Sequence, residues 1–226
     1  MKLCMFSPKD ADLPRGWPGR IDGDRVIQLA AQTLQAFFTG GGGAREHAEY
    51  PLAEVDLRAP VMYPPTVRLF KRQSLDFEFA NTASIYGPED EIPFPQGAHH
   101  IDVGLGLAAM IGVESAIGGY TLANTWLAPD LPGAKSRDFA LSIGPAVVTE
   151  LEGCVLRGSV AGRESHCEAT FEPEWNEIVA HAARNTRLRP GDLLIVDMGP
   201  GGFELRPGDV VALETDEIGV LQNRVV

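Results

Sequence analysis

The chain has 226 residues, a mass of 24.3 kDa, a formal net charge of −12 at pH 7 and a pI near 4.8. With 44% hydrophobic and 22% charged residues, it has the composition of a soluble globular protein with one core and a small appendage. The acidic balance and the lack of a basic stripe exclude a nucleic-acid partner. No apolar run approaches the roughly 20 residues that span a bilayer, so no membrane partner is expected.

The three cysteines, Cys4, Cys154 and Cys167, are an odd and widely spaced set. Their spacing favours neither a disulfide framework nor a zinc site, and predicts small buried side chains. Met1 to Arg15 carries charges and prolines too early for the apolar core of a signal peptide. We therefore expect a reduced, cytoplasmic protein.

Residues 1–58 are predicted to form a small amino-terminal α/β unit. Its expected elements are a strand over Met1–Phe6, a turn over Gly19–Asp24, a strand over Arg25–Ile27 and a helix over Leu29–Phe38. The Gly40–Gly43 run that follows invites a phosphate-loop interpretation. No Gly-Lys-Ser/Thr follows and no strand directly precedes it, so a flexible helix exit is favoured.

Residues 59–226 are predicted to be mainly strand, with turns at proline and glycine clusters. Two helices are expected, over Met110–Ile117 and Glu174–Arg184. The sequence Leu-Arg-Pro-Gly-Asp occurs at 188–192 and again at 205–209, each time before an apolar run. Proline followed by glycine makes a turn, so both copies predict a turn that enters a strand, in a pair of similar hairpins.

Three blocks carry a resemblance to a known family. They are His99–Gly112, Gly119–Asp130 and Pro132–Pro145, and inside each the spacing matches without gaps. They resemble patterns of the fumarylacetoacetate hydrolase family. The resemblance implies an α+β, mainly β fold, in which a mixed, mostly antiparallel β-roll over residues 59–226 surrounds a central pocket. It also implies a homodimer.

The metal-binding carboxylates that the resemblance implies are absent from this chain. The matching positions are Leu69, Gly104, Gly106 and Thr125, and the family's catalytic histidine loop is cut short. Residues two apart in a strand share a face, where two glutamates would converge on one hard cation, whereas glycine supplies no side-chain oxygen. No metal or other cofactor is therefore expected, although a metal rebuilt on Asp102, Asp130 and Asp138 is a further alternative.

The two glycines have two interpretations. They could mark a bulge or a close approach of backbones, or they could clear volume for a ligand where the metal would lie. Under both interpretations the inward face of the strand is expected to be empty.

Most candidate site residues come from the same blocks, and Tyr86 lies upstream of them. Lys135 survives from the third pattern and could stabilise an enolate or a carboxylate without a metal, with Asp138 pairing to it or orienting its loop. His100 is placed by strand alternation at the mouth of the pocket. The predicted catalytic residues are Lys135, Asp138 and His100. The predicted substrate-binding residues are Gly104, Gly106, Thr125, Asp102 and Tyr86. The family's substrate-binding threonine falls on Met198, in a shortened turn.

Two functions remain open on the sequence. One is a metal-independent enzyme acting on a keto-acid, β-dicarbonyl or polyketide-like small molecule by enolisation, cyclisation, decarboxylation or carbon–carbon cleavage. The alternative is a non-catalytic relative that binds a metabolite or scaffolds a catalytic paralogue. Preservation of the loop around Lys135 favours the first, and the joint loss of metal ligands and histidine favours the second.

Overall fold

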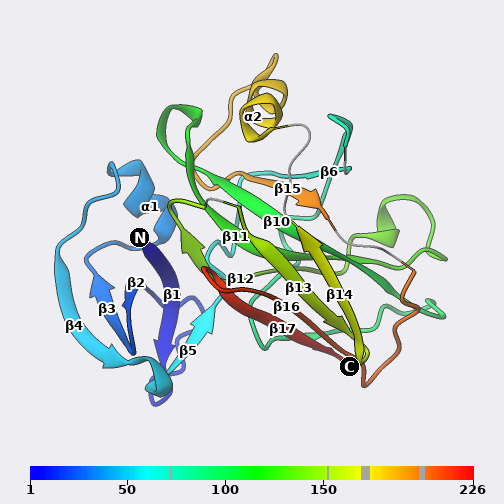
Figure 1. The fold of residues 1–226 in the computed structure, drawn as a ribbon, viewed down its shortest axis with the longest axis horizontal. Coiled ribbons are helices and arrows are strands. Elements are labelled where there is room, and N and C mark those ends of the chain that lie inside the picture. Colours follow the sequence, from blue (N-terminus) through cyan, green and yellow to red (C-terminus); the bar gives the residue numbers. More distant parts are fainter. Residues whose placement is uncertain (72, 152, 169–173, 199–201) are drawn as a thin grey trace.

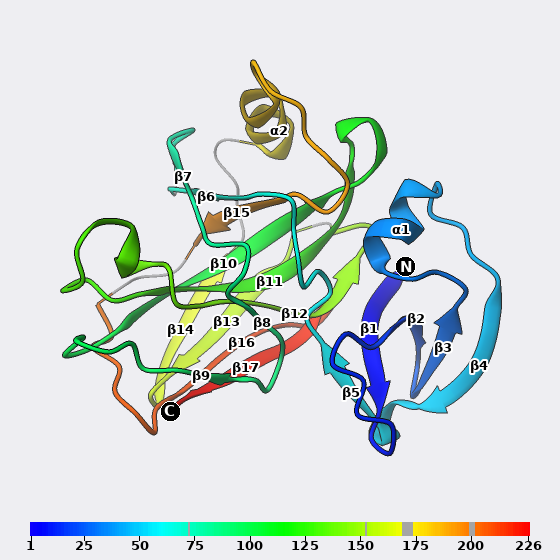
Figure 2. The ribbon, with the colours of Figure 1, turned by 180° about the vertical axis from the view of Figure 1, so that it is seen from behind.

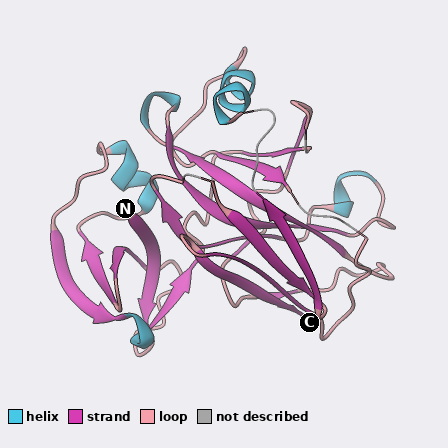
Figure 3. Cartoon of the chain, viewed as in Figure 1, coloured by secondary structure: helices cyan, strands magenta, loops and turns pink. Residues whose placement is uncertain are grey.

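The structure, a computed structural model, describes residues 1–226 except 72, 152, 169–173 and 199–201. Strands are the main regular element, and they form a small amino-terminal unit on one side and a larger body on the other (Figures 1 and 3). This confirms the α+β, mainly β fold class. No helix of the described residues is long and apolar enough to cross a membrane.

The larger of two sheets runs through both units. Its strand order is β4-β3-β2-β1-β12-β11-β10-β15-β6-β7, with β5 paired to β1 and β8 paired to β12. The bounds of its strands are β1 Lys2–Pro8, β2 Trp17–Asp22, β3 Arg25–Leu29, β4 Glu46–Pro51, β5 Val55–Arg58, β6 Val67–Phe70, β7 Phe77–Phe79, β8 Ile85–Tyr86, β10 Asp102–Ile111, β11 Ile117–Leu127, β12 Leu141–Val148 and β15 Leu193–Asp197. Pairing is antiparallel except for β12 with β8 and β15 with β6.

The smaller sheet packs against the larger one on the carboxyl-terminal side. Its order is β14-β13-β16-β17-β9, and its strands are β9 Glu91–Ile92, β13 Val155–Val160, β14 Arg163–Glu168, β16 Val210–Thr215 and β17 Gly219–Val225. One core cluster, which includes Ile101, Trp126 and Leu213, joins the two sheets. A second cluster, which includes Leu69, Ala123 and Ile195, lies on the opposite face of the larger sheet.

The amino-terminal unit holds the predicted first strand, but its second turn and its helix differ from expectation. Gly19 lies inside β2, so the turn is confined to Gly23 and Asp24. Leu29 ends β3, which pairs with β4, and helix α1 begins only at Leu34 and ends at Thr39.

The start of α1 follows from a cap. Thr33 has extended backbone geometry, and its hydroxyl accepts a hydrogen bond from the Ala36 amide at 3.0 Å. Gly40 caps the other end, and the amides of Gly41 and Gly42 donate to carbonyls of the last turn. The glycine run is therefore a helix exit, as predicted.

The predicted helix over Met110–Ile117 is wrong. Strand β10 continues through Met110 to Ile111, a 3-10 turn covers Val113–Ser115, and β11 begins at Ile117. Met110 lies between Gly119 of β11 and Leu193 of β15, so both edges of β10 are hydrogen-bonded there. A strand buried on both sides is continuously apolar, which is a pattern that a buried helix also shows.

The second helix is confirmed. Helix α2 spans Trp175–Ala183, and Glu174 and Glu177 form a reciprocal capping box at its start. It lies above β15 and β6 in both ribbon views (Figures 1 and 2). The two Leu-Arg-Pro-Gly-Asp turns do lead into strands, β15 and β16, but only β16 continues into a hairpin, with β17. Strand β15 instead inserts between β10 and β6.

Candidate functional site

Four neighbouring strands bring together the four positions that the resemblance gives to metal ligands. Gly104 of β10 lies opposite Thr125 of β11 in the sheet register. On the other side of β10, Gly106 lies opposite Asp197 of β15, and β15 in turn places Ile195 opposite Leu69. Leu69, Thr125 and Asp197 line one pocket of about 220 Å³. The motif spacing therefore identified positions that lie close together in the fold.

The space beside Gly104 is filled by Asp197. A Cβ placed on Gly104 would overlap the Asp197 carboxylate and lie 2.5 Å from Thr125 Oγ1. The Thr125 hydroxyl donates to Asp197 Oδ2 at 3.2 Å, and it lies 3.4 Å from the Gly104 carbonyl oxygen. The expectation of an emptied face is thus wrong at this position, because the carboxylate missing from β10 is replaced by one that reaches across from β15.

A different contact explains why position 106 is a glycine. A Cβ there would lie 2.5 Å from the carbonyl oxygen of Val196, which is backbone and has little freedom to move. Gly106 therefore permits a close approach of β15 to β10, the structural interpretation of a strand glycine. Neither glycine leaves room for a glutamate with β15 in this position.

The pocket over Thr125 has cationic side chains beside its carboxylate. Lys71, directly after β6, and Arg137, from the loop before β12, both line it. Arg137 is half-buried and donates from Nε to Glu78 Oε1 at 2.7 Å. Thr125 and Leu69 are buried, so the floor is shielded from water while the two cations lie nearer the opening. An anionic substrate would meet positive charge before it reached Asp197.

Arg137 also lines a neighbouring hollow of about 440 Å³, together with Glu78, Asn81 and Asp138. The Asn81 amide donates to Asp138 Oδ1 at 2.9 Å, and also to the Asp138 carbonyl oxygen at 3.0 Å. These bonds hold the loop that carries Arg137. Asp138 thus positions the loop, which is one of the two roles predicted for it.

Lys135 lies outside both hollows. It belongs to the 3-10 turn Gly133–Ser136, its side chain is 74% exposed, and it pairs with Asp138. The expected pairing with Asp138 is therefore present. The catalytic role predicted for Lys135 remains a prediction, with its ammonium in solvent rather than against Thr125.

The other predicted residues are not gathered at this pocket. Asp102 accepts hydrogen bonds from the amides of Gly202 at 2.6 Å and Phe203 at 3.0 Å, which anchors that turn. His100 precedes β10 rather than lying in it, and does not line the pocket. Tyr86 packs against the core between the two sheets, on the opposite face of the larger sheet, and burial raises the pKa of its hydroxyl.

The residues of this site do not fit the divalent metal that the resemblance implies. Leu69, Gly104 and Gly106 offer no side-chain oxygen, and Thr125 offers a neutral hydroxyl. Among the described residues that line the pocket, Asp197 supplies the single carboxylate, whereas a hard cation needs several oxygen ligands. No group of three or more His, Cys, Asp or Glu side chains in the described ranges is arranged to hold a metal ion.

The alternative metal site is also not assembled. Asp102 holds the Gly202 turn and Asp138 pairs with Lys135, while Asp130 accepts a hydrogen bond from the His99 amide at 2.6 Å. That hydrogen bond is the main cause of a lowered pKa for Asp130. The three carboxylates therefore serve three separate loops.

Sequence reasoning missed Asp197, Lys71 and Arg137. A signal existed for Arg137, because it is a second cation inside the matched block Pro132–Pro145, two residues after Lys135. No local signal marks Asp197, whose place depends on the register of β15 with β10. Met198, matched to the family's threonine, is buried, and residues 199–201 of that turn lie outside the described residues.

Comparisons with known proteins agree with this fold. An oxaloacetate tautomerase, the mitochondrial fahd2 of Xenopus laevis, is 25% identical over 292 aligned positions, which cover 100% of this chain and 90% of that protein. A crystal structure of 2-hydroxyhepta-2,4-diene-1,7-dioate isomerase from Mycobacterium marinum superposes with a TM-score of 0.86 at 23% identity, covering 100% of this chain and 98% of the other.

A second solved structure with this fold contains a metal ion and an organic acid. Maleylpyruvate hydrolase from Sphingobium sp. SYK-6, solved in complex with manganese(II) ion and pyruvate, has a TM-score of 0.81 at 18% identity, with 100% of this chain and 99% of the other covered.

The carboxyl-terminal domain model of fumarylacetoacetate (FAA) hydrolase matches residues 70–226, which is more than half of the chain. This protein therefore belongs to the fumarylacetoacetate hydrolase family.

Proposed function

We propose that this protein is an enzyme that interconverts the keto and enol forms of a small 2-oxo acid, in the Thr125 pocket and without a bound metal. The observation that carries the proposal is the replacement of the family's β10 carboxylates by Asp197, held by Thr125 in a pocket lined with Lys71 and Arg137. Relatives described as an oxaloacetate tautomerase and a dienoate isomerase support chemistry that passes through an enol.

In this proposal Asp197 moves the proton. Its carboxylate removes a proton from the carbon next to the keto group and delivers the same proton to the keto oxygen. The substrate therefore loses no atom. The Thr125 hydroxyl donates to Asp197 Oδ2 and fixes which way the carboxylate faces. A positioned carboxylate of this kind contributes about 10²- to 10⁴-fold in rate.

The two cations have a separate role in the proposal. Arg137 presents a planar fork that matches a carboxylate, while its Nε remains on Glu78. Lys71 supplies a second positive charge for the oxygen that becomes an enolate. In this proposal the negative charge on the substrate oxygens is stabilised by Arg137 and Lys71 instead of by a divalent ion.

The test measures enol-to-keto conversion of oxaloacetate by ultraviolet absorbance, after the protein has been treated with EDTA and assayed for metal content. We expect turnover to persist in the metal-free protein. Asp197→Asn should lower kcat by at least about 100-fold, because the amide no longer accepts a proton. Asp10→Asn, which alters an exposed aspartate in the β1–β2 turn, is the matched control and should leave kcat unchanged.

Two further variants separate this proposal from the prediction made on the sequence. Arg137→Met should raise KM about 10-fold or more through the loss of a charge-assisted pair, while Lys135→Ala should change neither constant. A loss of activity in Lys135→Ala, with Arg137→Met unaffected, would return the catalytic role to Lys135.

Activity that vanishes with EDTA and returns with Mg²⁺ or Mn²⁺ would refute the metal-free mechanism. No turnover of any 2-oxo acid would instead favour the non-catalytic alternative.

A further inference from the structure

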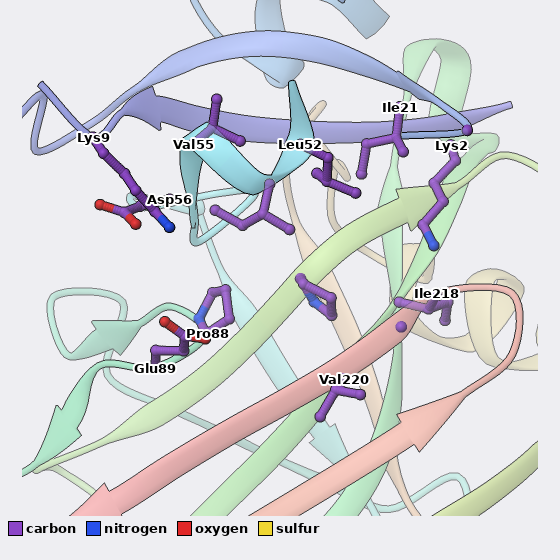
Figure 4. Close-up of a pocket in the computed structure, with 14 residues that line it drawn as sticks. Lys2, Lys9, Ile21, Leu52, Val55, Asp56, Pro88, Glu89, Ile218 and Val220 are labelled. Atoms are coloured by element: carbon purple, nitrogen blue, oxygen red, sulfur yellow. The ribbon is translucent and has the colours of Figure 1, made fainter. Parts of the chain in front are cut away.

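A third hollow, of about 370 Å³, lies between the amino-terminal unit and the β16–β17 turn (Figure 4). It shares no lining residue with the two hollows around Arg137. Its upper wall comes from β1, β5 and the segment between β4 and β5, and its lower wall from the start of β17 and the loop at Pro88. Its volume is within the range of small-molecule sites, roughly 300–1,000 Å³.

Both walls of this groove present apolar side chains. Ile21, Leu52 and Leu57 are partly buried against the small core of the amino-terminal unit, and they also line the groove. Facing them, Val220 keeps 46% of its surface exposed, beside Ile218. Two apolar walls that do not touch each other leave a slot that an apolar molecule would fill.

One end of the groove carries an ammonium group. The Lys2 side chain points down from β1 toward Ile218 in Figure 4, and it forms no hydrogen bond or ion pair with any described residue. The backbone of the β17 turn comes close to it, since a Cβ placed on Gly219 would lie 3.9 Å from Lys2 Nζ. Partial burial lowers the pKa of Lys2, although the charge of Glu217 acts in the opposite direction.

The end of the groove away from Lys2 carries two carboxylates as well as an ammonium group. Lys9 lies there, but its ammonium already donates to the Ala53 carbonyl oxygen at 2.9 Å. Asp56 and Glu89 lie at the same end (Figure 4). These carboxylates would repel a second anionic group, so the arrangement suits a molecule with negative charge at its Lys2 end only.

We propose that this groove binds a small organic monoanion, with its carboxylate on Lys2 and its apolar body between Leu57 and Val220. A partly desolvated ammonium that has no hydrogen bond or ion pair with the described residues, and feels the more distant charge of Glu217, gains more from an anion than an exposed one does. The site does not depend on the proposed tautomerase function.

Bound there, the ligand would touch the amino-terminal unit and the smaller sheet at the same time. Any molecule that binds the folded state alone raises its stability, so occupancy should raise Tm with ligand concentration. The groove would thus let the level of a carboxylic acid set the stability of the junction between the two units.

Calorimetric titration of the full chain with octanoate tests the proposal. We expect saturable binding with a stoichiometry near one, and at least about 10-fold weaker binding to Lys2→Met, which keeps the apolar stem but removes the charge. Arg163→Met, which removes an exposed cation on β14, is the matched control and should bind as the unmodified chain does.

A ligand change on the unmodified protein avoids any folding defect of the variant. Octanol has the same apolar body without the negative charge, and should bind at least about 10-fold more weakly than octanoate. Equal affinities for octanol and octanoate, an unchanged affinity in Lys2→Met, or no binding of octanoate would each overturn the proposal.

Discussion

Substitution of Gly104 by alanine tests whether Asp197 fills the space beside β10. The backbone of Gly104 is not in the left-handed region, so alanine meets no conformational strain there. Its Cβ would overlap the Asp197 carboxylate and approach Thr125 Oγ1 to 2.5 Å. We expect Gly104→Ala to destabilise the fold because the Asp197 side chain must be displaced.

The expected loss of stability in Gly104→Ala has two contributions. Forcing one methyl group into a packed site costs about 1–3 kcal/mol. Loss of the 3.2 Å hydrogen bond between Thr125 and Asp197 costs about 1 kcal/mol more. The free energy of unfolding should therefore fall by roughly 2–4 kcal/mol.

A double-mutant cycle isolates the cause. In Asp197→Ala the colliding atoms are gone, so adding Gly104→Ala should cost much less, with a coupling energy of about 1–3 kcal/mol. Gly106→Ala is the control, because its Cβ would meet the Val196 carbonyl oxygen, which Asp197→Ala does not remove. Urea unfolding of the four proteins and the control pair measures these energies. Additive effects of Gly104→Ala and Asp197→Ala would refute the steric argument.

Three further predictions concern stability. Trp126 Nε1 donates to Ser142 Oγ at 2.8 Å inside the core, so Ser142→Ala should lower the free energy of unfolding by about 1–3 kcal/mol in urea titrations. Thr33→Ala removes the cap on the Ala36 amide and should cost about 1 kcal/mol, most of which Thr33→Ser should recover in the same assay. Burial raises the pKa of the Cys4 thiol from 9.0 to about 12, so its stabilising contribution is complete below pH 9 and is lost as the pH rises toward 12. Between pH 8 and 11 the unmodified chain should lose roughly 2–3 kcal/mol more than Cys4→Ala, and parallel curves for the two proteins would contradict this.

Local patterns predicted those parts of the fold that local chemistry determines. Helix α2 is open to prediction from local sequence, because its capping residues and its apolar face lie within one short segment. The segment from Met110 to Ile117 was mispredicted because a strand with partners on both sides is as continuously apolar as a buried helix. Leu29 likewise joins a strand because of β4, which comes well after it in the chain.

The candidate site divides in the same way. Gly104 and Thr125 were found because their motifs are contiguous and they lie on neighbouring strands of one hairpin. Asp197 was not found because its place opposite Gly106 depends on the pairing of β15 with β10, which the residues around Asp197 do not indicate. The buried Cys4 and Cys154 match their predicted role as small apolar side chains, and the side chain of Cys167 lies outside the described residues.

The insertion of β15 between β10 and β6 has a consequence for how the protein folds. Strand β15 pairs residues as distant in sequence as Val67 and Leu193, and such pairings form slowly because a long loop must close first. The β10–β11 hairpin can form early, but its other edge stays open until β15 has been synthesised. The nascent chain therefore carries an unpaired apolar strand edge from the synthesis of β11, which ends at Leu127, until that of β15, which begins at Leu193, and misassembly with other chains would begin at this edge.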